Sequence, residues 1–134
     1  MPFADTCSAL TAADFKPLGL TLTKADHGLS DVPEICFYQV KAADGTTAQP
    51  SVEFVADNMF DATRALFNKA QYKFKDVSGV GDRAFTYTTL SPVLWVIAKG
   101  HLFHVDSTGL GAGVGTGNPE ADIETLAKAV VAKL

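Results

Sequence analysis

The stretch Val93–Asp106, with the sequence VLWVIAKGHLFHVD, contains two strand-like runs separated by Lys99 and Gly100. Both runs are rich in branched and aromatic residues, and glycine suits a tight turn between strands. We therefore predict an antiparallel hairpin of strands 93–99 and 101–106. Because both faces of the first strand are apolar, we expect it to be a central strand, with Trp95 in the core rather than in a ligand cavity.

The regions on either side of this hairpin predict further strands and three helices. Alternating or apolar runs indicate strands at 20–23, 34–41, 51–56, 72–77 and 83–89. Helices are expected from Thr11 to about Pro17, from Asp57 or Asn58 onward, and after Asn118. This order has no βαβ repeat. It predicts the α+β class, with a single, mostly antiparallel sheet of five to seven strands and helices packed on one face.

The length and charge of the chain limit its organisation and its partners. At 134 residues, of which 47% are hydrophobic, residues 1–134 fit one domain with its own core. The 11 basic and 15 acidic residues give a net charge of −4, and no dense basic run occurs, so we expect no nucleic-acid partner. The longest apolar run has six residues, whereas a membrane span needs about 20, so we expect no transmembrane segment.

Cys7 and Cys36 are the only cysteines. From the residues alone they could form a structural disulfide, remain small buried hydrophobic side chains, or include a reactive thiol. A bridge between them would close a loop of 29 residues and would stabilise the fold by about 3.6 kcal/mol through the unfolded state. No CxxC spacing indicates redox catalysis.

The beginning of the chain bears on where such a bridge could form. A disulfide indicates an oxidising compartment, but residues 1–6 contain neither a basic segment nor an apolar one of the kind found in an export signal. We expect that a leader was removed and that Met1 replaced it, which makes a secreted or periplasmic location the prediction. Residues 4–6 also lack the small apolar residues of a lipidation signal before Cys7.

His101, His104 and Asp106 are the densest group of possible metal ligands. On a regular strand His104 and Asp106 share one face while His101 points to the other, so a zinc or copper site would require a bulge after Gly100. These residues are therefore weak metal candidates. His27, in a separate loop, could join them only if the fold brought it there. We expect no resident cofactor.

Two glycine-rich segments resemble functional loops but fit structural roles better. Residues 109–117 do not have the GxGxxG spacing of a nucleotide loop, and we expect a mobile surface connection there. The segment Gly79–Phe85 is expected to be a tight connection between strands, with Asp82 bonding to its own backbone. No GxSxG or Cys–His motif identifies a catalytic residue.

Several short motifs occur in an order that resembles a known group of proteins. They are Cys7–Asp14, Leu18–Gly19, Cys36 with aromatic neighbours, Gly79–Phe85, the hairpin 93–106 and the final helix around Leu126–Ala127. Together they resemble small extracytoplasmic lipoprotein-type domains of bacteria and are similar to the extracellular sensor domains of mycobacterial serine/threonine kinases. The resemblance implies an exported domain with a Cys7–Cys36 disulfide, and it transfers no catalytic residue.

These observations favour a secreted or periplasmic, non-catalytic module that binds or senses a small molecule or a protein. The binding site is expected in a cleft between sheet and helices or along an exposed strand edge. Two alternatives are a small hydrolase that uses dispersed carboxylates with His101 or His104, and a metal-binding protein that uses the same histidines.

Overall fold

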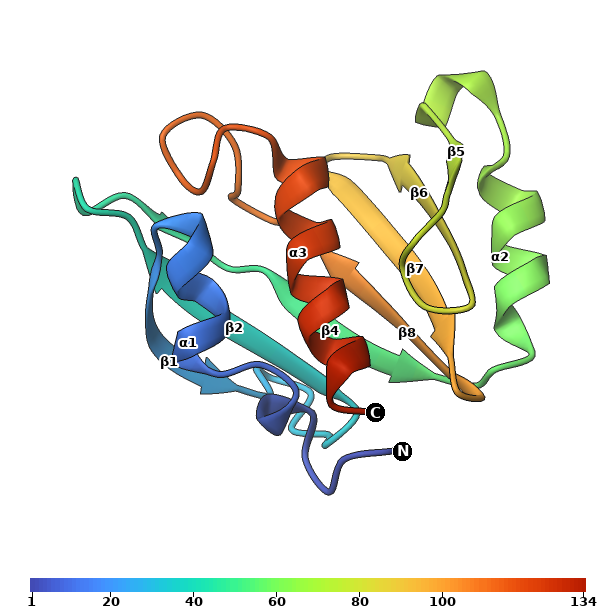
Figure 1. Ribbon diagram of the computed structural model, residues 1–134, viewed down its shortest axis with the longest axis horizontal. Helices are drawn as coiled ribbons and strands as arrows, with labels where there is room; N and C mark the ends of the chain where they lie inside the picture. The colour runs from blue at the N-terminus through green and yellow to red at the C-terminus, as the bar shows by residue number, and fades with distance from the viewer.

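The computed structural model describes residues 1–134 and contains one antiparallel sheet with three α-helices (Figure 1). The strands are β1 (Thr21–Asp26), β2 (Ile35–Lys41), β3 (Thr47–Ala48), β4 (Ser51–Val55), β5 (Lys75–Val77), β6 (Arg83–Thr88), β7 (Pro92–Ala98) and β8 (His101–Asp106). Hydrogen-bonded neighbours follow the order β1-β2-β4-β8-β7-β6-β5, and β3 pairs with β2. The predicted α+β class and antiparallel sheet are confirmed. The two-residue β3 raises the number of strands to eight, above the expected five to seven.

The hairpin β7–β8 forms as the sequence predicts. Lys99 and Gly100 have φ values of 51° and 79°, as a two-residue turn that follows the twist of the strands requires. Asp82, however, does not bond to its own backbone. Its carboxylate accepts a hydrogen bond from the Lys99 amide at 3.1 Å, and its amide donates to the Ile97 carbonyl at 2.8 Å. Asp82 therefore links the connection between β5 and β6 to the neighbouring hairpin.

The helices begin and end close to the expected positions. They are α1 (Ala12–Phe15), α2 (Met59–Phe67) and α3 (Pro119–Ala132), with 3-10 helical turns at Thr6–Ser8, Lys16–Leu18 and Ala70–Tyr72. Pro17 and Gly19, the latter with φ of 71°, end the first helical segment. Asn118 accepts a hydrogen bond from the Ala121 amide and caps α3, where Pro119 is the first residue.

The helices lie on both faces of the sheet, so the expectation that they share one face is wrong for α2. α1 and α3 cover one face, where Leu126 and Val130 belong to the main core with Val96 of β7. Phe60 of α2 lies on the other face, with its ring centroid 5.1 Å from that of Phe85 in β6. The physical reason is the apolar character of both faces of the central strands, which requires cover on each side.

The glycine-rich connection at 109–117 is anchored, which contradicts the expected mobile connection. Leu110 and Val114 are buried. The carboxylate of Asp122, which is 1% exposed, accepts hydrogen bonds from the amide and the hydroxyl of Thr116. Gly115, with φ of 88°, packs so closely against Asp122 that no Cβ would fit there. The glycines therefore permit a close approach to α3 rather than flexibility.

None of the helices has the length and apolar character needed to cross a bilayer.

Replacing Asp122 with Ala should destabilise the protein, because the substitution removes the buried carboxylate that accepts two hydrogen bonds from Thr116 and ties the loop to α3. We expect the free energy of unfolding to fall by about 1–3 kcal/mol in urea denaturation, with faster hydrogen exchange at the Thr116 amide. Glu124→Ala, two residues further along α3, is the matched control and should cause a smaller loss. Equal losses for the two variants would show that Asp122 does not anchor the loop.

Candidate functional site

The two cysteines form a disulfide that joins the N-terminal segment to the sheet. Their sulfur atoms are 2.02 Å apart, and Cys36 in β2 is fully buried. Two hydrogen bonds reinforce the same junction: Tyr38 donates from its hydroxyl to the Thr6 carbonyl at 2.7 Å, and the Thr6 amide donates to the Pro33 carbonyl at 3.0 Å. The structural disulfide is confirmed, so neither a free buried thiol nor a reactive thiol remains.

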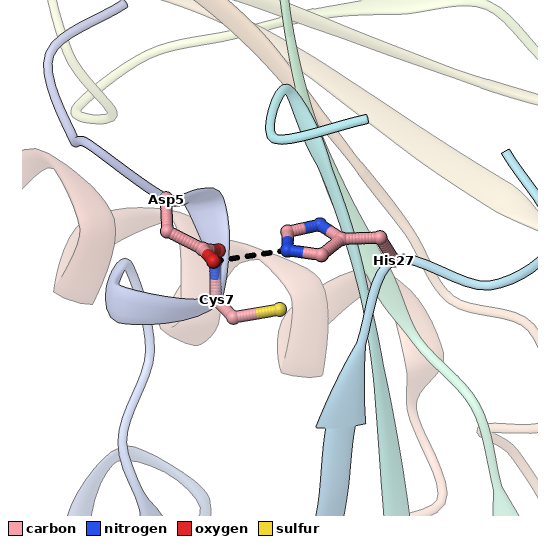
Figure 2. A group of neighbouring side chains, drawn as sticks. All are labelled: Asp5, Cys7 and His27. Atoms are coloured by element: carbon pink, nitrogen blue, oxygen red, sulfur yellow. Dashed lines mark hydrogen bonds and ion pairs between the residues drawn. The ribbon is translucent and has the colours of Figure 1, made fainter. Parts of the chain in front are cut away.

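An Asp5–His27 pair lies beside Cys7, one of the two disulfide cysteines (Figure 2). The imidazole Nε2 is 2.9 Å from the Asp5 carboxylate, and Nδ1 is 2.7 Å from the Ile35 carbonyl. Asp5 also accepts a hydrogen bond from the Cys7 amide at 2.7 Å. Since both ring nitrogens face acceptors, the doubly protonated imidazolium satisfies both contacts.

The pKa values of the two groups are shifted in the directions that favour this ion pair. The Ile35 carbonyl, followed by the Asp5 carboxylate, raises the pKa of His27. The hydrogen bond from the Cys7 amide, followed by that from His27, lowers the pKa of Asp5. Atoms of Asp5, Cys7 and His27 lie within 4.8 Å of one another, but Cys7 is bonded to Cys36 and both nitrogens of His27 are engaged. The group therefore fits a structural link between the N-terminal segment and the β1–β2 connection better than a metal site or a nucleophile with its base.

The structure does not bring the predicted metal candidates together. The register pairs His104 with Trp95 and His101 with Ala98, so the two imidazoles point to opposite faces, as strand alternation predicts. Asp106 accepts hydrogen bonds from the Thr108 amide and hydroxyl and from the Ser91 hydroxyl. These three residues therefore make no common ligand set.

His104 is also poorly placed to act as a general base. Its Nε2 is 2.9 Å from the Glu53 carboxylate, its ring stacks on Trp95 at 4.7 Å, and its Nδ1 is buried without a hydrogen-bond partner. The hydrogen bond from His104 lowers the pKa of Glu53. With Nε2 engaged by Glu53 and Nδ1 buried, the arrangement fits a structural pair better than a general base.

The strand edges are poor docking sites for another strand. β1 contains an irregularity in register between Leu22 and Lys24, and Lys24 forms an ion pair with Asp26 at 3.1 Å. β5, at the other edge, has only three residues. Bulges, charges and short length are the features by which natural sheets prevent edge-to-edge pairing.

A cavity of about 360 Å³ lies between α2 and the connection from β5 to β6. Three of its lining side chains are almost fully buried and apolar: Phe60, Val80 and Ala84. The rest of the wall consists of Val77, the glycine turn and charged or polar side chains: Arg64, Asp76, Ser78, Gly79, Asp82 and Arg83. A partly apolar hollow with a few polar groups at its rim is typical of small-molecule sites.

Two arginines define the charged part of this cavity. Arg64 of α2 donates two hydrogen bonds to Asp76, at 2.9 and 2.6 Å, and so connects the helix to β5. Arg83 makes a single contact of 3.1 Å with Asp61 and lies 4.5 Å from the centroid of the Phe60 ring. The Asp76 carboxylate raises the pKa of Arg64, while Arg64 lowers that of Asp76.

Sequence reasoning assigned the Gly79–Phe85 segment a structural role and missed the cavity beside it. Part of that interpretation holds, since a Cβ on Gly81 would lie 2.7 Å from the Val96 side chain and 2.8 Å from the Ile97 carbonyl. The same turn nevertheless forms a wall of the cavity. No local signal joins Arg64 to Arg83, because only the packing of α2 on the sheet brings them to one hollow.

Comparison of this chain with protein-family models, curated proteins and solved structures found no match.

Removing the disulfide should cost a large part of the stability of the protein. For the double variant Cys7→Ala and Cys36→Ala, we expect the free energy of unfolding to fall by about 2–4 kcal/mol, because the unfolded chain regains the freedom of a 29-residue loop. Urea denaturation measures the loss, and the wild-type protein treated with reductant should approach the same value. Unchanged stability in both cases would contradict a structural role for the bridge.

The contribution of the Asp5–His27 pair should depend on pH. Because the pKa of His27 is raised in the folded protein, its contribution is complete below the unfolded value of about 6.5 and is lost as the pH rises through the folded value. Asp5, whose pKa is lowered, remains ionised in the folded protein above about pH 4. His27→Gln should therefore be more destabilising near pH 5.5 than near pH 9.

Urea denaturation at the two pH values tests this expectation. His101→Gln is the matched control, since it removes another imidazole from a different part of the sheet. A loss of stability in His27→Gln that is the same at both pH values would exclude the ionic link.

Proposed function

We propose that the protein is a secreted or periplasmic, non-catalytic binding or sensing module whose ligand occupies the cavity between α2 and the β5–β6 connection. The observation that carries this proposal is a hollow of about 360 Å³ whose wall combines apolar side chains, including Phe60, with two arginines. Its volume lies in the range of small-molecule sites, about 300–1,000 Å³.

The disulfide supports the proposed location. Bridges of this kind persist in secreted and periplasmic proteins and are rare in a reducing cytosol. The resemblance of the sequence to extracellular sensor domains of bacterial kinases agrees with this location and with a role in detecting a ligand. A ligand that settles between α2 and β6 would connect two elements that otherwise meet mainly through aromatic side chains.

The non-catalytic part of the proposal rests on the groups that usually perform proton transfer or nucleophilic attack. His27 is held between Asp5 and a backbone carbonyl, and His104 is held by Glu53 with its other nitrogen buried. Both cysteines are in the disulfide. The cavity itself is lined by arginines and aspartates and by neither histidine nor cysteine.

The proposal is tested by screening a library of small polar and aromatic compounds against ¹⁵N-labelled protein. We expect ligands to shift the amide signals of the cavity, above all those of Ser78–Arg83. Ser78→Trp, which places an indole at the rim, should abolish these shifts. Thr125→Trp adds the same side chain on the exposed side of α3 and should leave them unchanged.

Two results would overturn the proposal. One is binding that perturbs another surface and is insensitive to Ser78→Trp. The other is turnover of a bound compound, which would favour the alternative of an enzyme.

A further inference from the structure

The cavity beside α2 contains more hydrogen-bond donors than acceptors. A guanidinium has five N–H groups, of which Arg83 uses one on Asp61 and Arg64 uses two on Asp76. The turn between β5 and β6 adds backbone donors, since the amides of the lining residues Gly79 and Val80 make no hydrogen bond within the chain. This wall therefore offers unpaired N–H groups from two side chains and one turn.

The two aspartates that line the cavity already accept hydrogen bonds. Both carboxylate oxygens of Asp76 accept from Arg64, and one oxygen of Asp82 accepts from the Lys99 amide. Asp61 is the acceptor nearest to Arg83, but its side chain is 80% exposed. A ligand that supplies acceptors would satisfy more of the wall than one that supplies donors.

The two arginines differ in how firmly they are held. Arg64 is 31% exposed and makes a bidentate contact, whereas Arg83 is 55% exposed and makes one contact to a largely exposed carboxylate. Exposed ion pairs contribute little to stability, so Asp61 is readily replaced on Arg83. The ring of the buried Phe60 lies 4.5 Å from the Arg83 guanidinium and orients that group.

We infer that the ligand carries a carboxylate or a phosphate, which Arg83 binds in place of Asp61. This inference rests on the proposed function and specifies the ligand of that site. Arginine matches both oxyanions because its planar N–H groups can form paired hydrogen bonds with two oxygens. Arg64 remains on Asp76 and keeps the wall in place.

The test uses four probes that share one ring: benzoate, phenyl phosphate, benzyl alcohol and benzylamine. Their affinities for the whole protein are measured by NMR titration at low salt, following the amides of Ser78–Arg83. We expect one or both anions to bind at this site and to bind at least about tenfold more tightly than the alcohol and the amine. Either anion supports the inference, and the tighter of the two identifies the headgroup.

Three variants separate the role of Arg83 from a general effect of charge. Arg83→Gln should weaken anion binding by about tenfold or more, whereas Asp61→Asn should strengthen it several-fold, because a competing carboxylate is removed. Lys41→Gln, which removes one positive charge from the exposed end of β2, is the matched control and should have little effect. A gain of affinity in Asp61→Asn cannot arise from misfolding.

The outcomes distinguish this inference from the proposed function. One outcome would overturn the inference alone: benzyl alcohol or benzylamine binds as tightly as the anions, Arg83→Gln changes nothing, and Ser78→Trp abolishes binding. The ligand would then not need a carboxylate or a phosphate, but the cavity would remain the binding site. If no probe and no library compound perturbs the cavity, both are wrong.

Discussion

The fold depends on burying both faces of β7. Val96 packs toward α3 while Trp95 points to the opposite side, so neither face of the central strand can be left to water. The 14-residue α3 covers the first face along its length. The second is covered by the nine-residue α2 and an aromatic cluster, in which Phe67 stacks on Tyr87 with a centroid distance of 3.8 Å. Because the short helix meets the sheet through large rings, a hollow remains beside it.

The N-terminal segment needs other means of attachment, because it has little regular structure. Its only α-helix has four residues, too few to be stable alone. The segment is instead fastened to β2 by the disulfide, by the hydrogen bond from Tyr38 to Thr6, and by the Asp5–His27 pair. These contacts also hold the β1–β2 connection through His27. The covalent bond thus acts together with local polar contacts that respond to pH.

Local signals predicted the elements, whereas contacts between distant residues decided what the sequence left open. The turn at Lys99-Gly100 and the cap at Asn118 depend on neighbouring residues and were predicted correctly. The sequence could not place α2 on the second face. The sequence also could not show that Arg64 and Arg83 line the same cavity, since their proximity depends on how α2 packs on the sheet. The prediction of a mobile connection at 109–117 was wrong because glycines alone indicate flexibility. The residue that anchors this loop, Asp122, lies within α3.

Most charged groups on the α2 side of the sheet form pairs that maintain the fold, whereas Arg83 makes only one contact, to an exposed carboxylate. Glu53 and His104 pair with each other beside Trp95, and Arg64 holds α2 to β5 through Asp76. Removing one partner of the part-buried Glu53–His104 pair would leave the other poorly compensated. Arg83 is different, because its partner is largely in water and the aromatic ring beneath it stays in place when that partner leaves. A site can bind and release an anion without loosening the fold only if structure and binding depend on different arginines, and this arrangement meets that condition.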